Sequence, residues 1–248
     1  MPIKNKVAVI TGASRGLGAG LAETFAAAGI RLGLCARSAV TPPETVEAVV
    51  AAVDVTDAQA VAAFAEQVEQ AFGAIDLWIN NAGVLDPVAP LRNIEPAAFR
   101  LLIDINVLGV AYGSQAYVRH CRRHGKGGVL INISSGAAQH GYAGWSAYCA
   151  SKAAVDRFSE AVALEEADQN LRVYAVAPGV VDTAMQQRIR NASEDDFPMV
   201  EKFHELKAQG HFNSPDFVGH ELLALAFDPA RRPSSVVVRI ANEWELGR

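Results

Sequence analysis

The stretch that decides the fold lies at residues 7–18 and reads VAVITGASRGLG, followed by AGLA at residues 19–22. The four apolar residues at its start predict a short buried strand, and AGLA begins a helical pattern. Glycine is needed where the chain turns sharply and where the backbone must approach a pyrophosphate, and the helix start then offers free N–H groups to the phosphates. Glycines also serve ordinary turns, but here they stand between a first strand and a helix. The stretch therefore predicts a dinucleotide-binding turn.

The same alternation of short apolar runs and longer amphipathic stretches continues along the 248 residues. Strands are predicted at Val7–Ile10, Arg31–Ala36, Val49–Val53, Leu77–Asn80, Val129–Ile133, Val173–Ala177 and Val236–Ile240. Helices are predicted at Gly18–Ala28, Asp57–Phe72, Pro96–His124 and Tyr148–Gln169. Several strands are continuously apolar, as in a parallel sheet buried on both faces. We therefore expect a single-domain Rossmann-type α/β fold, a doubly wound parallel sheet of about seven strands with helices on both faces.

Composition and charge narrow the class of protein. Half of the residues are hydrophobic and 20% are charged, which supplies a sizeable core. The formal net charge of -5, from 22 Lys and Arg against 27 Asp and Glu, gives no general attraction to nucleic acid or to an anionic membrane. The cysteines, Cys35, Cys121 and Cys149, follow no CxxC spacing, and the apolar run after Lys6 is too short for a signal peptide. We expect a cytoplasmic protein with no nucleic-acid or membrane partner.

One region breaks the alternation. No strand is predicted between Thr183 and Phe227, where a helical pattern is interrupted by prolines and a glycine. Ser214 and Pro215 are typical of a helix start, as the N-cap and the first helical residue. An excursion of this size late in an α/β fold usually covers a ligand site, although a packed surface insertion is the alternative. We expect a substrate-covering helical segment at about 183–227.

The end of the second predicted strand bears on the choice of cofactor. An NAD site places an acidic residue there to bind the ribose 2′-hydroxyl, whereas an NADP site avoids that charge and adds arginine. Here the strand ends in Leu-Cys-Ala and is followed by Arg37 and Ser38, with no acid. Arg15 in the glycine turn is a second candidate partner for a 2′-phosphate, although two solvated surface arginines are the alternative. The pattern favours NADPH/NADP+ over NADH.

Further motifs, in order along the chain, resemble those of the short-chain dehydrogenase/reductase family. They are TGASRGLG at 11–18, Asp54-Val55, Asn80-Asn81-Ala82-Gly83, Asn106, Ser135, YCASK at 148–152, and Pro178-Gly179 followed by Thr183. The resemblance covers nearly the whole chain. It implies an oxidoreductase that binds a nicotinamide cofactor and a small-molecule carbonyl substrate. It also implies a homodimer or homotetramer that assembles through the helices at 96–124 and 148–169.

The resemblance also implies a role for each matching residue. The implied catalytic set is Asn106, Ser135, Tyr148 and Lys152. Besides Tyr148 and Lys152, the implied cofactor contacts are Gly12, Ser14, Arg15, Gly16, Leu17, Gly18, Arg37, Asp54, Val55, Asn81, Ala82, Gly83, Pro178, Gly179, Val181, Thr183 and Met185. Of the two adjacent serines, the family spacing to the tyrosine favours Ser135 over Ser134.

The chemistry of the catalytic set can also be argued from residue types. Tyr148 and Lys152 are four residues apart, so on a helix they share a face. A phenol with an ordinary pKa of about 10 exchanges protons poorly at neutral pH unless its anion is stabilised, and a nearby ammonium lowers that pKa. The Ser135 hydroxyl is placed to hold a carbonyl oxygen on which negative charge develops. Asn106 would hold a water that links Lys152 to solvent. Taken alone, a tyrosine and a lysine at this spacing are equally compatible with a random helical pair.

Three stretches carry a narrower resemblance, to the sepiapterin and benzil reductases of this family. They are GWSAYCASK at 144–152, PGVVDTAMQ at 178–186 and FHELKAQG at 203–210. Sepiapterin reductases anchor the pterin with an acidic residue near the C-terminus, whereas this chain has Arg239 in roughly that place, followed by Glu243 and Glu245. The resemblance therefore implies an NADPH-dependent carbonyl reductase of ketones or vicinal diketones. The alternatives are an NADP-dependent alcohol dehydrogenase of the same family and a non-catalytic NADPH-sensing protein.

The remaining candidates concern the substrate pocket and a metal. The predicted pocket residues are Gln139, His140, Tyr142, Trp145, Gly179 and Met185, and His140 is equally compatible with a solvent-facing position. His120 and His124 are spaced like metal ligands on a helix. They also end a long helix just before Gly125, where cations complement the helix dipole and glycine caps the C-terminus. We predict helix capping there and no metal site.

Overall fold

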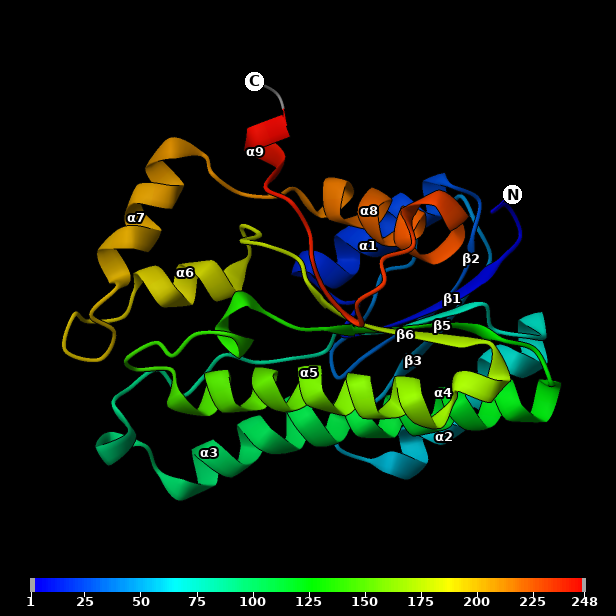
Figure 1. Cartoon of the computed structure of the whole chain (residues 1–248), viewed down its shortest axis with the longest axis horizontal. Helices are drawn as coiled ribbons and strands as arrows, with labels where there is room; N and C mark the ends of the chain where they lie inside the picture. Colours follow the sequence, from blue (N-terminus) through cyan, green and yellow to red (C-terminus); the bar gives the residue numbers. More distant parts are fainter. Residues whose placement is uncertain (1–2, 247–248) are drawn as a thin grey trace.

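The protein folds around a parallel β-sheet with helices on both faces (Figure 1). The computed structural model describes residues 3–246. Within them lies a seven-stranded sheet in the order β3-β2-β1-β4-β5-β6-β7, with every pairing parallel. The strands are β1 (Val7–Thr11), β2 (Arg31–Ala36), β3 (Ala48–Ala52), β4 (Leu77–Asn80), β5 (Gly128–Ile133), β6 (Leu171–Ala177) and β7 (Val237–Arg239). The predicted Rossmann-type sheet is confirmed.

The helices divide between the two faces of the sheet and one end of it. The α-helices are α1 (Gly16–Ala27), α2 (Ala58–Phe72), α3 (Pro96–Ile103), α4 (Gly109–His124), α5 (Ser146–Glu165), α6 (Ala184–Arg190), α7 (Val200–Gln209), α8 (Pro215–Phe227) and α9 (Glu243–Leu246). Short turns are η1 (Leu91–Asn93), η2 (Asp104–Leu108), η3 (Gly136–Ala138), η4 (Ala167–Gln169) and η5 (Pro229–Arg231). In Figure 1, α1 and α8 cover one face, α2, α4 and α5 cover the other, and α6 and α7 lie beyond the carboxyl ends of the strands.

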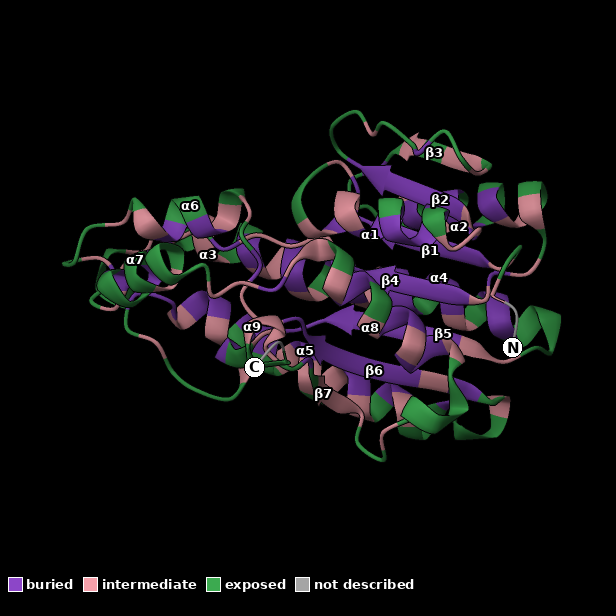
Figure 2. Ribbon diagram, turned by 90° about the horizontal axis from the view of Figure 1, so that it is seen from above, coloured by how far each residue is buried: buried purple, intermediate pink, exposed green. Residues whose placement is uncertain are grey.

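Strand β1 shows why the central strands are continuously apolar. Its residues alternate between the faces, so that Ala8 and Ile10 join the core under α1 and α8. Val7 and Val9 join the second core, under α2, α4 and α5. Strands β1 and β4 are buried throughout and β2, β5 and β6 are buried except for one residue each, whereas the edge strands β3 and β7 are only partly covered (Figure 2). The expectation of two buried faces is therefore wrong for the apolar run at 49–53, because it forms an edge of the sheet.

The strand order reverses beside β1 and so locates the site. The chain runs outward from β1 through β2 to β3, then returns to place β4 on the other side of β1. In such sheets a crevice forms at the carboxyl ends of the strands on either side of the reversal. The glycine turn after β1 and the Asn81–Gly83 loop after β4 both lie at this crevice.

Two predicted helices differ from the structure. The run Pro96–His124 is helical throughout, but the π-helical turn η2 separates α3 from α4. The helix predicted at 148–169 begins earlier, at Ser146, and its α-helical part ends at Glu165. The separate turn η4 follows and ends at Asn170, whose φ of 52° lies in the left-handed region. Ser214 does cap α8 as predicted, accepting a hydrogen bond of 3.1 Å from the Phe217 N–H.

The run Pro96–His124 also passes a length and composition test for a membrane span. The mean hydropathy of its most apolar window is 1.3, and it is the one helix in residues 3–246 to pass. Its α4 part packs against α2 and the strands β4 and β5, in the second core. This packing is that of a core helix.

Candidate active site

The turn between β1 and α1 is shaped by its glycines. Gly12 and Gly16 have φ values of 67° and 58°, in the left-handed region that favours glycine. A Cβ on Gly18 would lie 2.3 Å from the Gly12 carbonyl oxygen, so only glycine lets the helix begin this close to the strand. The backbone here is therefore free of side chains where a ligand would approach it.

The first turn of α1 is open to an anion. Its N-cap residue, Arg15, has an extended backbone and makes no side-chain cap. The first N–H groups of the helix, including that of Leu17, therefore have no capping side chain. Free N–H groups and the positive end of the helix dipole attract phosphate. The turn fits the pyrophosphate of a dinucleotide, because glycines keep open a cradle that side chains would fill.

Asn81 joins this turn to the loop after β4. Its Nδ2 donates to the carbonyl oxygens of Thr11 at 2.9 Å and Gly12 at 3.1 Å. In return, the Thr11 hydroxyl accepts from the backbone N–H groups of Asn81 and Ala82, both at 3.1 Å. The structure thus brings together two motifs that lie about 70 residues apart in the sequence.

The two predicted arginines lie at the open side of the glycine turn. Arg15 and Arg37 are both exposed. Next to them, the Ser38 hydroxyl donates to the Ser14 hydroxyl at 2.9 Å, which links the end of β2 to the turn. Ser38 was not among the predicted cofactor contacts, although it directly follows Arg37.

Asp54 and Val55 follow β3 at the same edge of the sheet. The backbone N–H of Thr56 lowers the pKa of Asp54, and the nearby charge of Arg37 acts in the same direction. Val55 is buried against α4, where a Cβ on Gly109 would lie 2.8 Å from its side chain. The exposed carboxylate of Asp54 therefore lies near Arg37, and the side chain of the next residue, Val55, is buried.

Asn106 is fully buried in the turn η2. Its Oδ1 accepts from the Val84 N–H at 2.8 Å, and its Nδ2 donates to the Val84 carbonyl at 2.8 Å and to the Ser151 hydroxyl at 3.2 Å. A Cβ on Gly83 would lie 3.3 Å from Asn106 Oδ1 and 3.7 Å from Lys152 Nζ. The side chains of Asn106 and Lys152 therefore both lie next to Gly83. Turns of the π type are frequent at functional sites, because they insert one extra residue into a helix.

Ser135, Tyr148 and Lys152 come together where β5 ends. Lys152 Nζ donates to the Ile133 carbonyl at 2.8 Å and lies 5.7 Å from the centre of the Tyr148 ring. Ser135 begins the turn η3, where its hydroxyl accepts from the Ala137 N–H at 3.2 Å. Tyr148 and Lys152 lie on successive turns of α5, as their spacing predicts.

Burial controls the protonation of this group. It raises the pKa of Tyr148 to about 12, although a hydrogen bond with the Ser135 side chain acts to lower it. It lowers the pKa of Lys152 to about 8, although the charge of Asp156 acts to raise it. The expectation that the Lys152 ammonium lowers the phenol pKa is therefore wrong for the protein alone, because desolvation is the larger effect. At neutral pH the phenol keeps its proton and Lys152 is mostly charged.

An aromatic cluster packs beside Tyr148. Trp145 stacks on Phe197 with ring centres 4.5 Å apart and meets the edge of Tyr148 at 5.7 Å. Tyr142 and Phe203 lie 5.2 and 5.6 Å from Trp145. Tyr142 and Trp145 are predicted pocket residues. Phe197 and Phe203 were not predicted, and the signal that could have found them is their aromatic character within the strand-free region.

The other predicted pocket residues do not all join this cluster. Met185, on α6, packs against it. Gln139 and His140 follow η3 and are exposed. Of these three residues, Met185 therefore packs against the aromatic cluster, whereas Gln139 and His140 face solvent at its open edge.

The loop after β6 lies against the glycine turn. Thr183 Cγ2 is 3.2 Å from the position that a Cβ on Gly16 would occupy. Gly179 has a φ of 78°, and a Cβ there would lie 2.6 Å from Asn213 Nδ2. That Nδ2 donates to the Pro178 carbonyl at 2.9 Å. The loop from Pro178 to Thr183 is thus in contact with the glycine turn on one side and with Asn213 on the other.

Asn213 and Glu243 link this loop to the end of the chain, and we call them the Asn213–Glu243 clamp. Asn213 Nδ2 also donates to the Ala241 carbonyl at 3.0 Å, and its Oδ1 accepts from the Glu243 N–H at 2.7 Å. The Glu243 carboxylate accepts from the Ser214 N–H at 2.5 Å and from its hydroxyl at 3.1 Å. Glu243, one of the acids considered near the C-terminus, is thus engaged within the protein.

Comparison with known proteins decides the family. The family model described as "short chain dehydrogenase" matches residues 6–194. The chain belongs to the short-chain dehydrogenase family. Short-chain dehydrogenases are oxidoreductases that use nicotinamide cofactors, bind small-molecule substrates and commonly form oligomers. The predicted family is thereby confirmed, and the chain is an oxidoreductase.

Individual relatives agree with the narrower resemblance. A benzil reductase ((S)-benzoin forming) of Bacillus cereus is 37% identical over 164 residues, which are 65% of this chain and 66% of that protein. A benzil reductase ((S)-benzoin forming) of Bacillus subtilis (strain 168) is 31% identical over 228 residues, 88% of this chain and 91% of that protein. The crystal structure of the KRED1-Pglu enzyme aligns with a TM-score of 0.82 and 32% identity, over 94% of this chain and 99% of that one.

A buried polar network supports this short-chain dehydrogenase behind its site. Asn80 Nδ2 donates to Asn132 Oδ1 at 2.8 Å and to the Ser114 hydroxyl at 3.1 Å, and Asn80 Oδ1 accepts from Trp78 Nε1 at 2.8 Å. Asn132 Nδ2 then donates to the Ser159 hydroxyl at 2.9 Å. The network ties α4 and α5 to neighbouring strands. A polar residue inside an apolar strand, as at Asn132, is the sequence signal for such a network.

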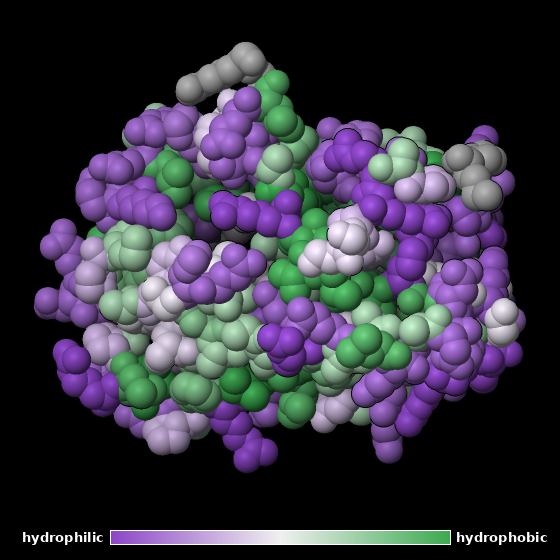
Figure 3. Space-filling view, in the orientation of Figure 1, coloured by the Kyte–Doolittle hydropathy of each residue, from purple (hydrophilic) through white to green (hydrophobic). Residues whose placement is uncertain are grey.

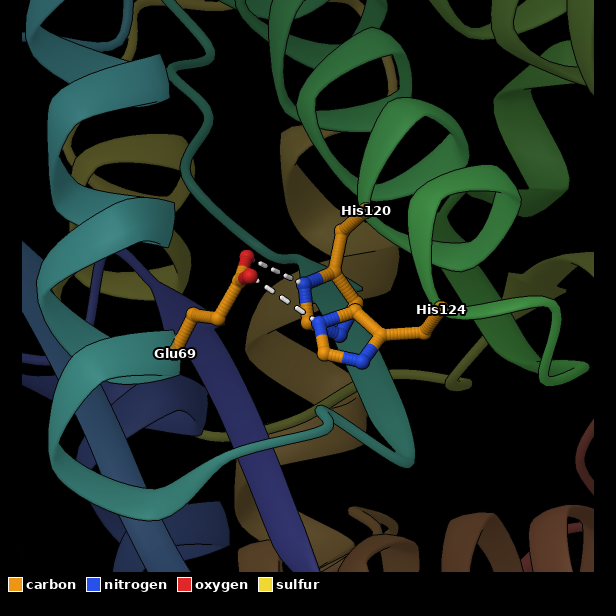
Figure 4. Close-up of side chains that lie close together, drawn as sticks. All are labelled: Glu69, His120 and His124. Atoms are coloured by element: carbon orange, nitrogen blue, oxygen red, sulfur yellow. Dashed lines mark hydrogen bonds and ion pairs between the residues drawn. The ribbon is translucent and has the colours of Figure 1, made fainter.

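A second polar cluster lies at the other end of α4. Figure 4 shows Glu69, on α2, pointing toward His120 and His124. Its carboxylate oxygens lie 2.8 Å from His120 Nδ1 and 2.9 Å from His124 Nε2, and Arg123 donates to the same carboxylate at 2.8 Å. The potential ligand atoms of the two histidines and Glu69 all lie within 4.8 Å of one another, close enough to hold a metal.

The hydrogen bonds of His120 argue against a metal in this cluster. Its Nε2 accepts from the Ile75 N–H at 2.9 Å, so the proton of the neutral ring lies on Nδ1, the nitrogen that faces Glu69. A metal on Nδ1 would leave an imidazolate or break the bond to Ile75. The cluster thus serves as a link between α2, α4 and the start of β4. The predicted capping of the helix end is confirmed, because Gly125 ends α4 with a φ of 57° and Arg122, Arg123 and His124 lie in its last turn. His120 lies one turn earlier, and its ring is buried.

Proposed function

We propose that this protein is an NADPH-dependent carbonyl reductase that acts on ketones or vicinal diketones. The observation that carries the proposal is the contact group at the end of β5, where the protonated phenol of Tyr148 lies beside Ser135 and the buried ammonium of Lys152. This group lies at the same sheet edge as the glycine turn. Asn106, Ser135, Tyr148 and Lys152 are accordingly the proposed catalytic residues.

The proposed chemistry uses each residue in a defined protonation state. A bound NADPH supplies the hydride that reduces the carbonyl carbon. Tyr148 donates its proton to the carbonyl oxygen. Its pKa of about 12 means that the phenol is protonated at neutral pH and has this proton to give. The Ser135 hydroxyl donates to the same oxygen while negative charge develops on it. Lys152 stabilises the phenolate that is left, and Asn106 holds a water through which the proton is replaced.

The choice of NADPH rests on charge at the end of β2. Arg15 and Arg37 are exposed beside the Ser14–Ser38 pair, and no acidic residue ends the strand. Guanidinium groups bind phosphate oxygens in a bidentate manner, so the two arginines favour the 2′-phosphate of NADPH. Asp54 lies near Arg37 and is proposed to contact the adenine side of the cofactor with Val55. The remaining cofactor contacts are those of the two motif loops and of the loop from Pro178 to Met185.

The substrate class is argued from the aromatic cluster. Trp145 is buried, and its Nε1 has no hydrogen-bond partner among residues 3–246. An apolar, aromatic wall next to the proton donor favours a carbonyl carried by an aryl group. The benzil reductases among the relatives support the same substrate class. Gly179 and Met185 complete the proposed pocket, with Gln139 and His140 at its open rim.

The 183–227 segment is proposed to cover this pocket within a single domain. It supplies Phe197 and Phe203 to the aromatic cluster. Val181, just before the segment, pairs with Asn213, within it, as an isolated bridge. On the face in Figure 3 the surface is hollowed between the α6–α7 region and the C-terminal segment. A cover in this position would determine which carbonyls reach Tyr148.

We also propose an oligomeric state and a cellular location for the protein. Three large apolar side chains are exposed along the helices that the family resemblance places between subunits: Leu101, Leu108 and Leu164. Covering them in a homodimer or homotetramer would remove apolar area from water. We also propose a cytoplasmic location, because Cys35, Cys121 and Cys149 are free thiols, as is usual in a reducing compartment.

The same residues would serve an NADP-dependent alcohol dehydrogenase in the reverse direction. The protonation states favour the reductase, because reduction needs a protonated phenol. A non-catalytic NADPH sensor is the remaining alternative. The proton donor beside a buried ammonium argues against it, because a sensor transfers no proton.

The test is consumption of NADPH, followed by its fluorescence, with benzil, sepiapterin, small vicinal diketones and simple aldehydes, each repeated with NADH. We expect turnover of aryl ketones or diketones with NADPH and little with NADH. Tight NADPH binding without turnover of any carbonyl would contradict the reductase. Equal turnover with NADH would contradict the role of Arg15 and Arg37.

A further inference from the structure

Three consecutive residues at the end of β5 are each held by a different turn of α5. Lys152 Nζ donates to the Ile133 carbonyl at 2.8 Å. Tyr148, one turn earlier, is hydrogen-bonded to the Ser135 side chain. Asp156, one turn after Lys152, accepts a very short hydrogen bond from the Ser134 hydroxyl through its Oδ1. The proposed chemistry uses the first two of these contacts and leaves the third without a role.

The third contact fixes the residue next to the proposed catalytic serine. Ser134 is 3% exposed, and its backbone N–H donates to the Val176 carbonyl at 2.8 Å. Its hydroxyl donates to Asp156, so it is held by β6 on one side and by α5 on the other. Ser135 follows directly and must point its hydroxyl at the substrate oxygen. A shift of Ser134 would therefore be passed to Ser135 through a single peptide unit.

The same carboxylate acts on Lys152 through its charge. Asp156 is half-buried one helical turn from Lys152, and its charge opposes the loss of the proton that burial of Lys152 favours. Besides Ser134 and Lys152, the groups that act on Asp156 are Arg157 and Glu160, both on α5. Burial raises the pKa of Asp156, and the hydrogen bond from Ser134 and the charges of Lys152 and Arg157 lower it. The hydrogen bond from Ser134 thus favours the charged carboxylate.

We propose that Asp156 is a positioning residue for the reaction. Through Ser134 it holds Ser135 in place, and through its negative charge it keeps Lys152 in the ammonium form. The proposal rests on the reductase function proposed above. It predicts two separable effects, because the hydrogen bond and the charge can be removed one at a time.

The charge is tested with Asp156→Asn, which retains an oxygen to accept from Ser134. Reduction needs a charged Lys152, so the rate falls as the pH rises through the pKa of that lysine. In Asp156→Asn we expect the alkaline limb of kcat to move to lower pH by about one unit. Asp156→Glu keeps the negative charge, so the alkaline limb of its kcat should lie at the same pH as in the wild type. The control is Glu160→Gln, which removes a charge one turn farther along α5, away from Ser134, and should leave the limb unchanged.

The hydrogen bond is tested with Ser134→Ala, which keeps the charge of Asp156. We expect kcat to fall about tenfold at every pH, the loss of one hydrogen bond to a charged group, with the alkaline limb unmoved. A Ser134→Ala enzyme with unchanged kcat would overturn the positioning of Ser135.

A measurement without turnover separates this proposal from the reductase function. The pKa of Lys152 is followed by NMR of protein labelled with 15N-lysine, with the resonance assigned by its loss in Lys152→Arg. We expect a lower pKa in Asp156→Asn and no change in Glu160→Gln. An unchanged pKa in Asp156→Asn, or an equal shift in Glu160→Gln, would overturn the electrostatic role. Absence of carbonyl turnover in the wild type would contradict only the proposed function, because the NMR result does not depend on it.

Discussion

The carboxyl end of the sheet and the 183–227 segment are held by different kinds of interaction. At the sheet end, Asn81, Asn106 and Lys152 each make part-buried or buried hydrogen bonds with the backbone of a neighbouring loop or strand. In the segment, Arg190 and Lys207 reach back to Asp182 at 3.2 and 2.5 Å, with the Lys207 and Asp182 side chains partly exposed. Buried hydrogen bonds determine geometry, whereas exposed ion pairs contribute about 0–1 kcal/mol each.

From this difference we expect the sheet end to determine the chemistry and the 183–227 segment to determine the choice of substrate. The proposed proton donor and its partners lie on elements that move only if the core moves. The aromatic cluster depends partly on α7 and the residues before it, where Phe197, Val200 and Phe203 are buried by apolar packing. Substitutions in the segment should therefore alter KM for the carbonyl substrate, while substitutions at the sheet end should alter cofactor binding or kcat. The Asn213–Glu243 clamp joins the two regions.

The largest effect is expected from Gly18→Ala, at the sheet end. The added Cβ would meet the Gly12 carbonyl oxygen at 2.3 Å, so the turn must open where it faces the phosphates. Each lost hydrogen bond to a charged group costs about 1.5–3 kcal/mol, so NADPH affinity should fall about a hundredfold or more in a fluorescence titration. Gly141→Ala is the control, because a Cβ there has no atom within 4 Å. Equal affinities for the two variants would contradict the role of the turn.

Asn213→Ala should affect both regions at once. It leaves the carbonyls of Pro178 and Ala241 and the N–H of Glu243 without their partner. Unpaired buried groups cost about 1–3 kcal/mol each, so we expect unfolding in urea about 2–4 kcal/mol easier and kcat/KM at least tenfold lower. Asn242→Ala is a matched control, since the Asn242 side chain donates to the exposed side chain of Glu245. A loss of stability with kcat/KM unchanged would show that the clamp does not reach the site.

A smaller effect is expected from protonation of His120, which belongs to the scaffold. Burial lowers its pKa below 6.5, although Glu69 acts to raise it. The unfolded chain therefore binds the proton more readily, and the stabilisation, complete above pH 6.5, is lost as the pH falls. One proton gives a slope of at most about 1.4 kcal/mol per pH unit. Denaturation in urea between pH 5 and 7 should show this slope, and His120→Gln should flatten it; an equal slope in both would contradict the assignment.

The smallest effect on stability is expected from Lys207→Met in the segment. It removes a partly exposed ion pair with Asp182, worth about 0–1 kcal/mol, so the melting temperature should change by no more than about 4 °C. KM for the carbonyl should nevertheless change severalfold, with kcat and NADPH affinity retained. Arg157→Met, which breaks the exposed Arg157–Glu160 pair on α5, should leave KM unchanged. A change of kcat without a change of KM in Lys207→Met would contradict the division between the two regions.

Local signals account for what the sequence could predict. The glycine turn, the Tyr148–Lys152 spacing and the N-cap at Ser214 depend on residues within one turn or loop, and all three have the expected local geometry. The apolar runs at the centre of the sheet are confirmed as strands because burial on both faces leaves a clear pattern. The turn η2 could not be read from the same periodicity, since one inserted residue barely changes it.

Contacts made only by folding account for what could not be predicted. Asn213 lies 35 residues from Pro178, its bonding partner, and no spacing rule joins them. Asp156 and Ser134 meet only when α5 packs beside β5. The pKa of Tyr148 also could not be predicted from the sequence, because burial and the hydrogen bond with the Ser135 side chain, which arise only in the folded protein, act on it.

The most direct measurement compares Tyr148→Phe with the wild type in two respects, kcat for the best carbonyl substrate and the Kd for NADPH. Loss of the proton donor should lower kcat by about 10²–10⁴-fold, while the Kd stays within about twofold because the phenyl ring keeps its packing. A kcat within tenfold of the wild type would contradict proton donation by Tyr148 and with it the proposed reaction.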